Sequence, residues 1–167
     1  MNLIVNVTKN WGIGYENHLL VSISQDLRRF RSLTQGKTVI LGRKTLETFP
    51  GGRPLRNRNN IILSSNREFL AEGATVVHSG EELKKALNGI PPDDICVIGG
   101  ASVYEELLPY CEKAFVTMTD TELPADRFCP NLEKLPEWEL KEKSEIMTEN
   151  GLSFQYLDYL NRSPLKL

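Results

Sequence analysis

The sequence is poor in cysteine, histidine and net charge, and each shortage excludes a class of protein. Its 167 residues include three cysteines, Cys96, Cys111 and Cys129, with no C-x-x-C pair, so we expect no disulfide framework and a reducing, cytoplasmic location. With only His18 and His78 present, we expect no histidine-built metal site and predict no metal. A net charge of -2 argues against a nucleic-acid partner, because nucleic-acid binders usually carry a basic excess.

Long apolar runs are lacking too. The longest have the length of a strand, far short of the roughly 20 residues that cross a bilayer. The N-terminus has no basic region followed by an apolar run, as a secretory signal would have. We therefore expect no membrane partner. The length suits a single domain over residues 1–167 with its own core, and nothing in the sequence demands more than a monomer.

Short apolar runs alternate with helical patterns, which predicts an α/β fold. The expected strands are residues 3–7, 38–41, 60–63, 75–77, 95–98 and 113–118, mostly continuous apolar runs typical of strands covered on both faces. The expected helices are residues 26–34, 44–48, 81–88 and 102–108. Residues 22–25 have the spacing of a capping box, which predicts that the first helix begins before Asp26.

The C-terminal part changes character. Residues 138–144 and 152–160 alternate apolar and polar side chains, with Phe154, Tyr156 and Leu160 on one side of the second stretch. Asn150-Gly151 between them is a strong hairpin signal. We therefore expect a mostly parallel central sheet with flanking helices that ends in a C-terminal antiparallel hairpin.

Two glycine-rich segments resemble nucleotide-binding motifs without meeting their requirements. Gly12-Ile13-Gly14 supplies two glycines of a dinucleotide fingerprint, but Asn17 occupies the third position and no clear helix follows. Gly36-Lys37-Thr38 ends like a P-loop, but Arg31 occupies the first glycine position and a strand follows. We therefore reject both motifs.

Two other glycine turns are better placed to hold a phosphate. Gly42-Arg43-Lys44-Thr45 and Gly99-Gly100-Ala101-Ser102 each follow a strand and open a short helix. Such turns direct backbone N–H groups at one spot, and Arg43 adds a planar cation suited to a phosphate monoester. Glycine is common in tight connections that bind nothing, but two such turns at the carboxyl edge of one open sheet favour a dinucleotide.

Asp26 is the candidate acid. It is expected at the start of a helix, among Ile23, Leu27 and Phe30. An acid in a first helical turn most often complements the helix dipole. The functional alternative is a carboxylate in an apolar cleft that pairs with a heterocycle offering two parallel N–H donors.

Four segments, taken in order and with their spacing, resemble dihydrofolate reductase, and residues 53–64 between them also resemble that family. The resemblance covers essentially the whole chain, and its segments are Ile13-Gly14-Tyr15-Glu16-Asn17, Asp26-Leu27-Arg28-Arg29-Phe30, Val39-Ile40-Leu41-Gly42-Arg43-Lys44-Thr45 and Val97-Ile98-Gly99-Gly100-Ala101-Ser102-Val103-Tyr104. It implies an NADPH-dependent reduction of 7,8-dihydrofolate to tetrahydrofolate, which feeds one-carbon metabolism, and it implies that dihydrofolate and antifolate inhibitors are its small-molecule partners.

The resemblance also implies roles for single residues. Asp26 is expected to bind the pterin 2-amino group and N3 and to support protonation at N5, with Thr117 hydrogen bonded to it. Arg58 is expected to pair with the α-carboxylate of the glutamate tail. The pterin pocket is expected to be lined by Ile4, Val5 and Ile98, with the Ile4 and Ile98 carbonyls near the amino group, and the aminobenzoyl part to be held by Leu27, Phe30, Phe49 and Leu55.

NADPH is the expected cofactor, and the lid that keeps water from its nicotinamide is expected at residues 9–24. The residues implied for NADPH are Asn6, Ile13, Gly14, Gly42, Arg43, Lys44, Thr45, Leu63, Ser64, Ser65, Asn66, Gly99, Gly100, Ala101, Ser102, Val103 and Tyr104. Among them, Arg43 and residues 64–66 would surround the adenosine 2′-phosphate, which would explain a preference for NADPH over NADH.

The sequence departs from the family's pattern at Leu20 and Val21, where a Pro-Trp pair is usual, and residues 49–53 contain one extra residue. Val21 has no donor with which to order a water beside the pterin. Two alternatives remain open. One is a reductase of the same fold that acts on a riboflavin precursor, and the other is a folate- and NADPH-binding protein that has lost turnover.

Overall fold

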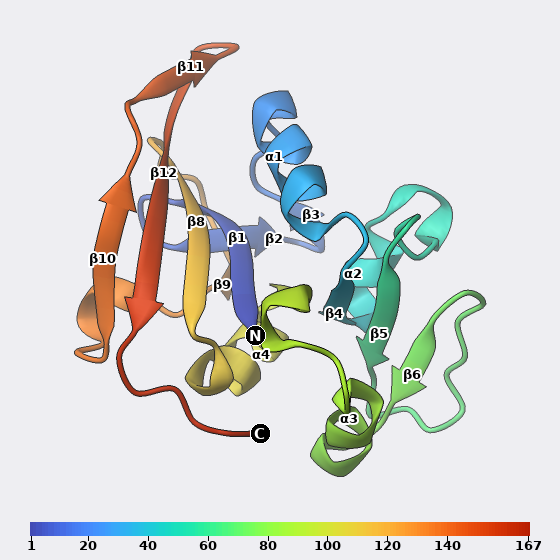
Figure 1. Ribbon diagram of the computed structural model, residues 1–167. Coiled ribbons are helices and arrows are strands. Elements are labelled where there is room, and N and C mark those ends of the chain that lie inside the picture. Colours follow the sequence, from blue (N-terminus) through green and yellow to red (C-terminus); the bar gives the residue numbers. More distant parts are fainter.

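A large nine-stranded sheet forms the centre of the molecule in the computed structural model, which describes all 167 residues (Figure 1). Its order is β10-β12-β8-β1-β7-β4-β5-β6, with β11 paired to β12. Strands β6, β5, β4, β7, β1 and β8 run parallel, and β12 runs antiparallel to β8. The bounds are β1 (Asn2–Thr8), β4 (Thr38–Gly42), β5 (Asn59–Leu63), β6 (Thr75–Val77), β7 (Ile95–Gly99), β8 (Lys113–Thr119), β10 (Trp138–Lys143), β11 (Met147–Glu149) and β12 (Leu152–Asn161).

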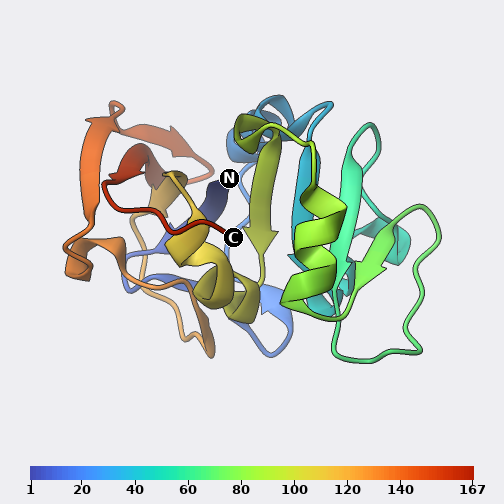
Figure 2. The ribbon, with the colours of Figure 1, turned by 60° about the horizontal axis from the view of Figure 1, so that its bottom comes forward.

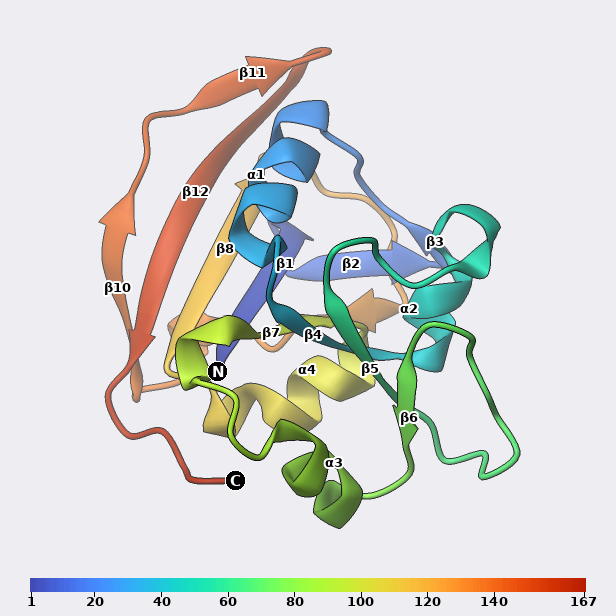
Figure 3. The ribbon, with the colours of Figure 1, turned by 45° about the vertical axis from the view of Figure 1, so that its right-hand side comes forward.

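Four α-helices cover both faces of this sheet, as the continuous apolar strands predict. Helices α3 (Gly80–Leu87) and α4 (Ala101–Leu107) pack on one face, whose core contains Leu3, Val5 and Val97. Helices α1 (Ser24–Thr34) and α2 (Arg43–Glu47) lie on the other face, whose core contains Ile4 and Ile98. Figure 2 looks onto the α3–α4 face, and Figure 3 shows α1 on the opposite side. No helix is long and apolar enough to cross a membrane.

The predicted fold is confirmed: every expected strand and helix is present, with ends shifted by one or two residues. Short 3-10 turns also occur at Pro50–Gly52, Pro92–Asp94, Leu108–Tyr110 and Leu132–Lys134. The first of these occupies the loop with the extra residue, where Gly51 has a φ of 65°.

A second, three-stranded sheet was not predicted. Strand β2 (Gly12–Tyr15) lies between β3 (His18–Leu19) and β9 (Arg127–Phe128), so the segment expected as an irregular lid is largely a braced hairpin. Asp126 holds it further, because its carboxylate accepts from the Glu16 N–H at 3.1 Å. At Gly12 a Cβ atom would lie 2.8 Å from the Ala125 Cβ atom. That glycine therefore permits close packing, in agreement with our rejection of a phosphate motif there.

The C-terminal hairpin differs in detail from its prediction. Asn150 and Gly151 form the turn, with φ angles of 51° and 80°, but they join β11 to β12 and not β10 to β12. Strand β10 pairs with the far half of β12 instead. Strand β12 is hydrogen bonded to β8 along one edge and to β10 along the other, and side chains on both of its faces are buried. Phe154 is buried on one face, and Tyr159 is buried on the other.

The C-terminal hairpin also fixes helix α1, and this contact replaces the predicted capping box. The N-cap residue is Ile23, and the Glu149 carboxylate on β11 accepts from the Ser24 and Gln25 N–H groups at 2.7 and 3.2 Å and from the Ser24 hydroxyl at 2.7 Å. One turn further on, Arg29 pairs with Asp158 of β12 at 3.2 Å. The prediction that α1 begins before Asp26 is confirmed, but its cap comes from a distant strand.

We predict that Glu149→Gln lowers the melting temperature by about 1–3 °C at neutral pH, because the helix loses a charged cap. Hydrogen bonds from Ser24 lower the pKa of Glu149 from its ordinary 4.5. A depressed pKa in the folded state stabilises the fold above the ordinary value, and this stabilisation is lost as the pH falls through the folded-state pKa. The difference between variant and wild type should therefore shrink as the pH falls below the ordinary value of 4.5 and through the lowered pKa of Glu149.

Glu145→Gln is the matched control, because Glu145 is exposed on the preceding segment and its carboxylate makes no hydrogen bond. Thermal unfolding from pH 3 to pH 8 measures both variants. An equal loss of stability in the two, or a Glu149 effect that does not diminish between pH 8 and pH 3, would contradict the capping role.

Candidate active site

The candidate site opens where two parallel strands separate. Strand β1 pairs with β7 only at Asn2 and Leu3, whereas its pairing with β8 continues to Thr8. Beyond Leu3 the carboxyl half of β1 therefore diverges from β7. A cavity of about 210 Å³ lies at this divergence, between the two strands, α1 and the turn after β7.

The cavity brings together about half of the predicted site residues. Its walls include Ile4, Val5, Asn6, Ile13, Asp26, Leu27, Phe30, Thr45, Phe49, Ile98, Gly99, Gly100, Tyr104 and Thr117. Sequence reasoning assigned no site role to several other wall residues, among them Leu19, Leu33, Thr48 and Phe115, and it identified Val21 only as a departure. The predicted residues outside these walls are Gly14, Gly42, Arg43, Lys44, Leu55, Arg58, Leu63, Ser64, Ser65, Asn66, Ala101, Ser102 and Val103.

The apolar face of α1 explains why this helix carries the site. Leu27, Phe30 and Leu33 recur at helical spacing, yet none of them is fully buried, and Leu27 is 57% exposed. All three line the cavity. Phe30 and Leu33 pack partly on the core, yet this apolar face also borders an open space, which favours an apolar ligand beside the helix.

Asp26 lies in the first turn of α1 with its carboxylate held by two side chains from the sheet. Oδ1 accepts from Thr117 Oγ1 at 2.6 Å, and Oδ2 accepts from Asn6 Nδ2 at 3.0 Å. Asn6 on β1 and Thr117 on β8 face each other in register, so the pairing of these strands presents both donors together. The half-buried carboxylate faces the cavity, which favours the functional interpretation of Asp26 over that of a helix-dipole residue alone.

Tyr104 spans the gap between the separated strands. Its hydroxyl on α4 lies 2.7 Å from the Ile4 carbonyl and 2.9 Å from the Ile98 carbonyl. Burial raises the pKa of Tyr104 well above its ordinary 10, so the phenol stays neutral. We expected these two carbonyls beside a ligand amino group, and the structure shows that they already share one hydroxyl proton. Each carbonyl keeps a second lone pair for a ligand.

The two glycine turns lie against each other at the carboxyl edge of the sheet, as their strands β4 and β7 are neighbours. A Cβ atom on Gly100 would lie 3.0 Å from the Thr45 hydroxyl, and one on Gly42 would lie 3.9 Å from the Gly100 nitrogen. Gly99 has a φ of 127°, which side chains rarely adopt, and the Gly99–Gly100 peptide is cis. The turns form a surface of bare backbone that an added side chain would fill.

The predicted phosphate residues gather at the ends of β4 and β5. Gly42 pairs with Leu63, which brings Arg43 and Ser64 to the same edge of the sheet. Arg43 makes only one exposed ion pair, with Glu47 at 3.5 Å, and such surface pairs contribute little to the stability of the fold. In the turn after β5 the Asn66 N–H donates to the Ser64 hydroxyl at 3.2 Å, and His78 Nδ1 lies 2.8 Å from the Ser64 carbonyl oxygen. No pattern in the sequence placed His78 beside this turn.

Arg58 lies at the other end of α1 from the acid. Its Nη1 donates to Thr34 Oγ1 at 3.0 Å, and its Nε donates to the Arg56 carbonyl at 2.8 Å. Burial, with nearby Arg31, lowers the pKa of Arg58 from its ordinary value. Thr34 is eight residues beyond Asp26, or roughly 12 Å along the helix. A ligand that reaches both Asp26 and the Arg58 guanidinium must therefore be elongated.

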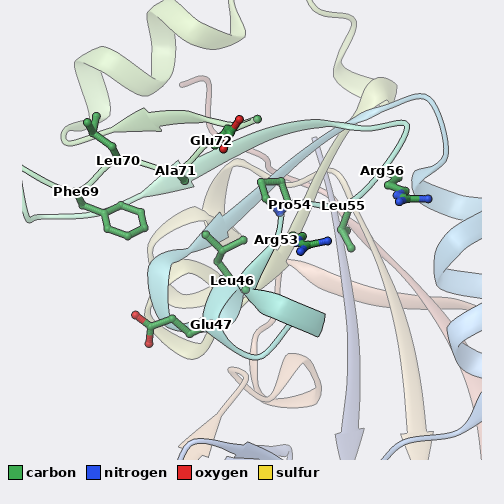
Figure 4. A pocket seen from close by; sticks show the side chains of 12 residues that line it. Leu46, Glu47, Arg53, Pro54, Leu55, Arg56, Phe69, Leu70, Ala71 and Glu72 are labelled. Atoms are coloured by element: carbon green, nitrogen blue, oxygen red, sulfur yellow. The ribbon is translucent and has the colours of Figure 1, made fainter.

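A wider depression of about 590 Å³ lies beside α2, between residues 52–56 and 69–73 (Figure 4). Leu55, predicted to hold the aminobenzoyl group, lines this depression and not the Asp26 cavity, although it packs against the same core cluster as Phe30 and Phe49. Hydrogen bonds with Asn60 fix its backbone. The depression contains neither Asp26 nor a glycine turn after a strand, so the chemistry belongs to the smaller cavity.

Comparisons with known proteins agree with this geometry. A family model described as dihydrofolate reductase matches residues 1–161. The chain is 32% identical over 168 residues to a dihydrofolate reductase of Bacillus subtilis, covering 99% of this chain and 97% of that one. It is 39% identical over 140 residues to a dihydrofolate reductase of Haemophilus influenzae, covering 84% of each.

A solved structure is also similar. Dihydrofolate reductase from Enterococcus faecalis, complexed with NADP(H) and RAB-propyl, superposes with a TM-score of 0.85 at 31% identity and covers 96% of this chain and 95% of that one.

We predict that Tyr104→Phe lowers the free energy of unfolding by about 1–3 kcal/mol, because two buried carbonyls lose their shared donor. Urea denaturation measures the change. Tyr110→Phe is the control, since the Tyr110 hydroxyl makes no hydrogen bond within the protein. Equal stability of the two variants would show that the hydroxyl bridge between β1 and β7 contributes nothing.

Proposed function

The chain belongs to the dihydrofolate reductase family, and we propose that the cavity between β1 and β7 performs the family's reaction, with Asp26 as the group that binds and activates the substrate ring. The reaction is the NADPH-dependent reduction of 7,8-dihydrofolate to 5,6,7,8-tetrahydrofolate. One observation carries the assignment of the acid. In a largely apolar cavity, both oxygens of one carboxylate are held by side-chain donors and face the open space.

The surface at the carboxyl edge fits the NADPH cofactor, because the paired glycine turns leave bare backbone and Arg43 adds an exposed cation. NADPH supplies the hydride when it is bound. We infer that Asn6, Ile13, Gly14 and Thr45 contact its nicotinamide half, and that Gly42, Lys44 and residues 99–104 hold its phosphates. Arg43 with residues 63–66 holds the adenosine end and its 2′-phosphate. The braced β2–β3 hairpin, next to this surface, excludes water from the reacting atoms.

The substrate side of the cavity has a polar group at each end of α1 and apolar side chains between. Asp26 accepts two N–H bonds from the pterin ring, and Thr117 fixes the carboxylate and contacts the same ring. Ile4, Val5 and Ile98 lie against the ring. Leu27, Phe30, Phe49 and Leu55 hold the aminobenzoyl group, and Arg58 pairs with the α-carboxylate beyond it. The elongated shape implied by the separation of Asp26 and Arg58 matches this division.

The protein's own part in the reaction is positioning and proton supply. Reduction adds a hydride to C6 and a proton to N5, so the ring nitrogen must become more basic as the reaction proceeds. The ionised Asp26 carboxylate, bonded to the opposite side of the ring, stabilises the protonated ring electrostatically. Val21 lines the cavity and offers no hydrogen-bond donor, so the proton reaches N5 without help from this position.

The chain's small-molecule ligands are dihydrofolate and the antifolates that compete with it. We further infer that the chain works as a monomer and as one domain in the cytoplasm. Its three cysteines are buried and unpaired. Its most exposed large apolar side chains, such as Leu19, Leu70 and Ile146, lie on segments far apart in the fold (Figure 1). One continuous sheet carries both core clusters.

The decisive experiment follows NADPH absorbance in the presence of dihydrofolate, with and without methotrexate. We expect rapid oxidation by the wild type, blocked by methotrexate. We predict that Asp26→Asn reduces turnover near neutral pH by roughly 100-fold or more while NADPH binding changes only a few fold. Asp120→Asn is the control, because Asp120 is exposed and pairs only with Lys9.

Wild-type turnover in the Asp26→Asn variant would refute the role of the acid. No oxidation by the wild type, with both ligands bound, would instead indicate a binding protein that has lost turnover. No binding of folate at all would favour the alternative of a riboflavin-precursor reductase, although Asp26 together with Arg58 favours folate.

We predict that Arg58→Leu weakens dihydrofolate binding by about 1–3 kcal/mol, because a charged hydrogen-bonded pair is lost. The Michaelis constant for dihydrofolate measures the effect. Arg56→Leu is the control, since Arg56 is exposed and two residues away. An unchanged Michaelis constant in the Arg58 variant, or an equal rise in both, would remove Arg58 from the site.

A further inference from the structure

The side chain of Asn6 connects the acid to the buried sheet. Its Nδ2 donates to Asp26 Oδ2 at 3.0 Å, and its Oδ1 accepts from the Thr119 hydroxyl at 2.9 Å. Thr119 is completely buried on β8, two residues after Thr117. Each polar atom of the amide is therefore engaged by one protein group, and each keeps one further hydrogen-bonding position.

The orientation of this amide depends on the charge of Asp26. If the amide were reversed, its oxygen would face a carboxylate oxygen at 3.0 Å, and two acceptors at that distance repel. The Thr119 hydroxyl can donate to Oδ1, which suits the orientation with Nδ2 toward Asp26. The network thus recognises the ionised carboxylate.

Few other groups act on the acid. The structure gives Oδ2 no other protein donor, and Val21 and Ile23 on the cavity wall have no side-chain donors. Arg29, on the same helix, points its guanidinium to Asp158 and stacks 3.9 Å from the centre of the Tyr156 ring. Asn6 is therefore the partner of one carboxylate oxygen, as Thr117 is of the other.

The titratable groups around the acid lie outside the neutral range. Burial raises the pKa values of Tyr104 on α4 and Tyr156 on β12, and hydrogen bonds from Ser24 lower that of Glu149 on β11. Arg28 and Arg29 are the basic side chains that follow Asp26 on α1. A change in the titration of the Asp26 carboxyl carbon that accompanies loss of the Asn6 amide is therefore attributed to that amide.

We propose that Asn6 is a positioning residue that holds Asp26 Oδ2 and stabilises the charge of the carboxylate. An ionised carboxylate has about two acceptor sites on each oxygen. Thr117 occupies one site on Oδ1 and Asn6 occupies one on Oδ2, so each oxygen keeps one site for a ligand. This geometry selects a planar heterocycle with two parallel N–H donors. Only the expected change in the hydride-transfer rate rests on the proposed function; the expected change in the Asp26 titration does not.

The test is Asn6→Ala, followed by 13C NMR titration of the Asp26 carboxyl carbon in the protein without ligands. Because the lost N–H donor stabilised only the charged form, the inflection should move to higher pH by about one unit. The hydride-transfer rate at pH 7, measured in a single turnover, should fall about tenfold, the effect of one hydrogen bond to a charged group. Binding of NADPH should stay within about threefold, because the peptide of residue 6 is kept.

Asn6→Asp keeps the volume and replaces the donor by an acceptor. Two carboxyls at this distance cannot both ionise easily, so we expect a slower rate than in Asn6→Ala at neutral pH, with the deficit shrinking as the pH rises and both carboxyls ionise. Thr119→Val removes the hydroxyl that holds the Asn6 amide, so it should raise the pH of the Asp26 inflection by less than Asn6→Ala does. Asn2→Ala is the matched control, a buried asparagine at the start of the same strand, and its titration should equal that of the wild type.

An unmoved inflection in Asn6→Ala would overturn the proposal, even if the rate fell, because the effect would then be one of packing. A moved inflection with an unchanged rate would also overturn it. Wild-type behaviour of Asn6→Asp would do the same. The NMR titration needs no turnover, so a wild-type protein that fails to reduce dihydrofolate would refute the proposed function and leave this test intact.

Discussion

The separation of β1 from β7 is the constraint on which the site depends. Parallel strands normally share hydrogen bonds along their whole length, but these two pair only at Asn2 and Leu3. The backbone groups beyond Leu3 must find other partners, since buried polar groups without them are costly. The Tyr104 hydroxyl serves the Ile4 and Ile98 carbonyls. The gap thus remains open without leaving those groups unsatisfied, and the cavity, the acid and the glycine turns all border it.

Helix α1 then gives the cavity its polarity. Its first turn carries Asp26, and its last turn lies beside Arg58 and Arg31. An anion and a pair of cations are therefore separated by an apolar helical face that stays open. A ligand must match this order, with N–H donors at one end, a flat apolar middle and a carboxylate at the other. Dihydrofolate has that order, so the charges at the two ends of α1 match the proposed substrate.

The sequence predicts well wherever the signal is local. Residues 38–41 and 95–98 are uninterrupted apolar runs, and they form central strands covered on both faces. The strand–glycine–helix turns follow from the same local reasoning. The small sheet was missed because β3 and β9 have only two residues each, and β9 pairs with β2 across a long stretch of chain. No local pattern marks a contact of that kind.

In the candidate site, too, some residues were predicted from the sequence and contacts between distant residues were not. Resemblance to a family supplies Asp26 and Thr117, and the structure brings them within hydrogen-bond distance. The amide of Asn6 beside the same carboxylate was not foreseen, because the two residues are 20 positions apart and meet only where helix α1 lies against β1. The Glu149 cap was missed for the same reason, as it joins residues about 125 positions apart.

That cap has a consequence for protein synthesis. Asp26 leaves the ribosome about 125 residues before the strands that fix its helix through Glu149 and Asp158. Domains fold as units while the chain emerges, and contacts between distant residues form slowly. The helix that carries Asp26 is therefore synthesised long before its anchors, and the nascent chain cannot hold it in its final position until both strands have emerged.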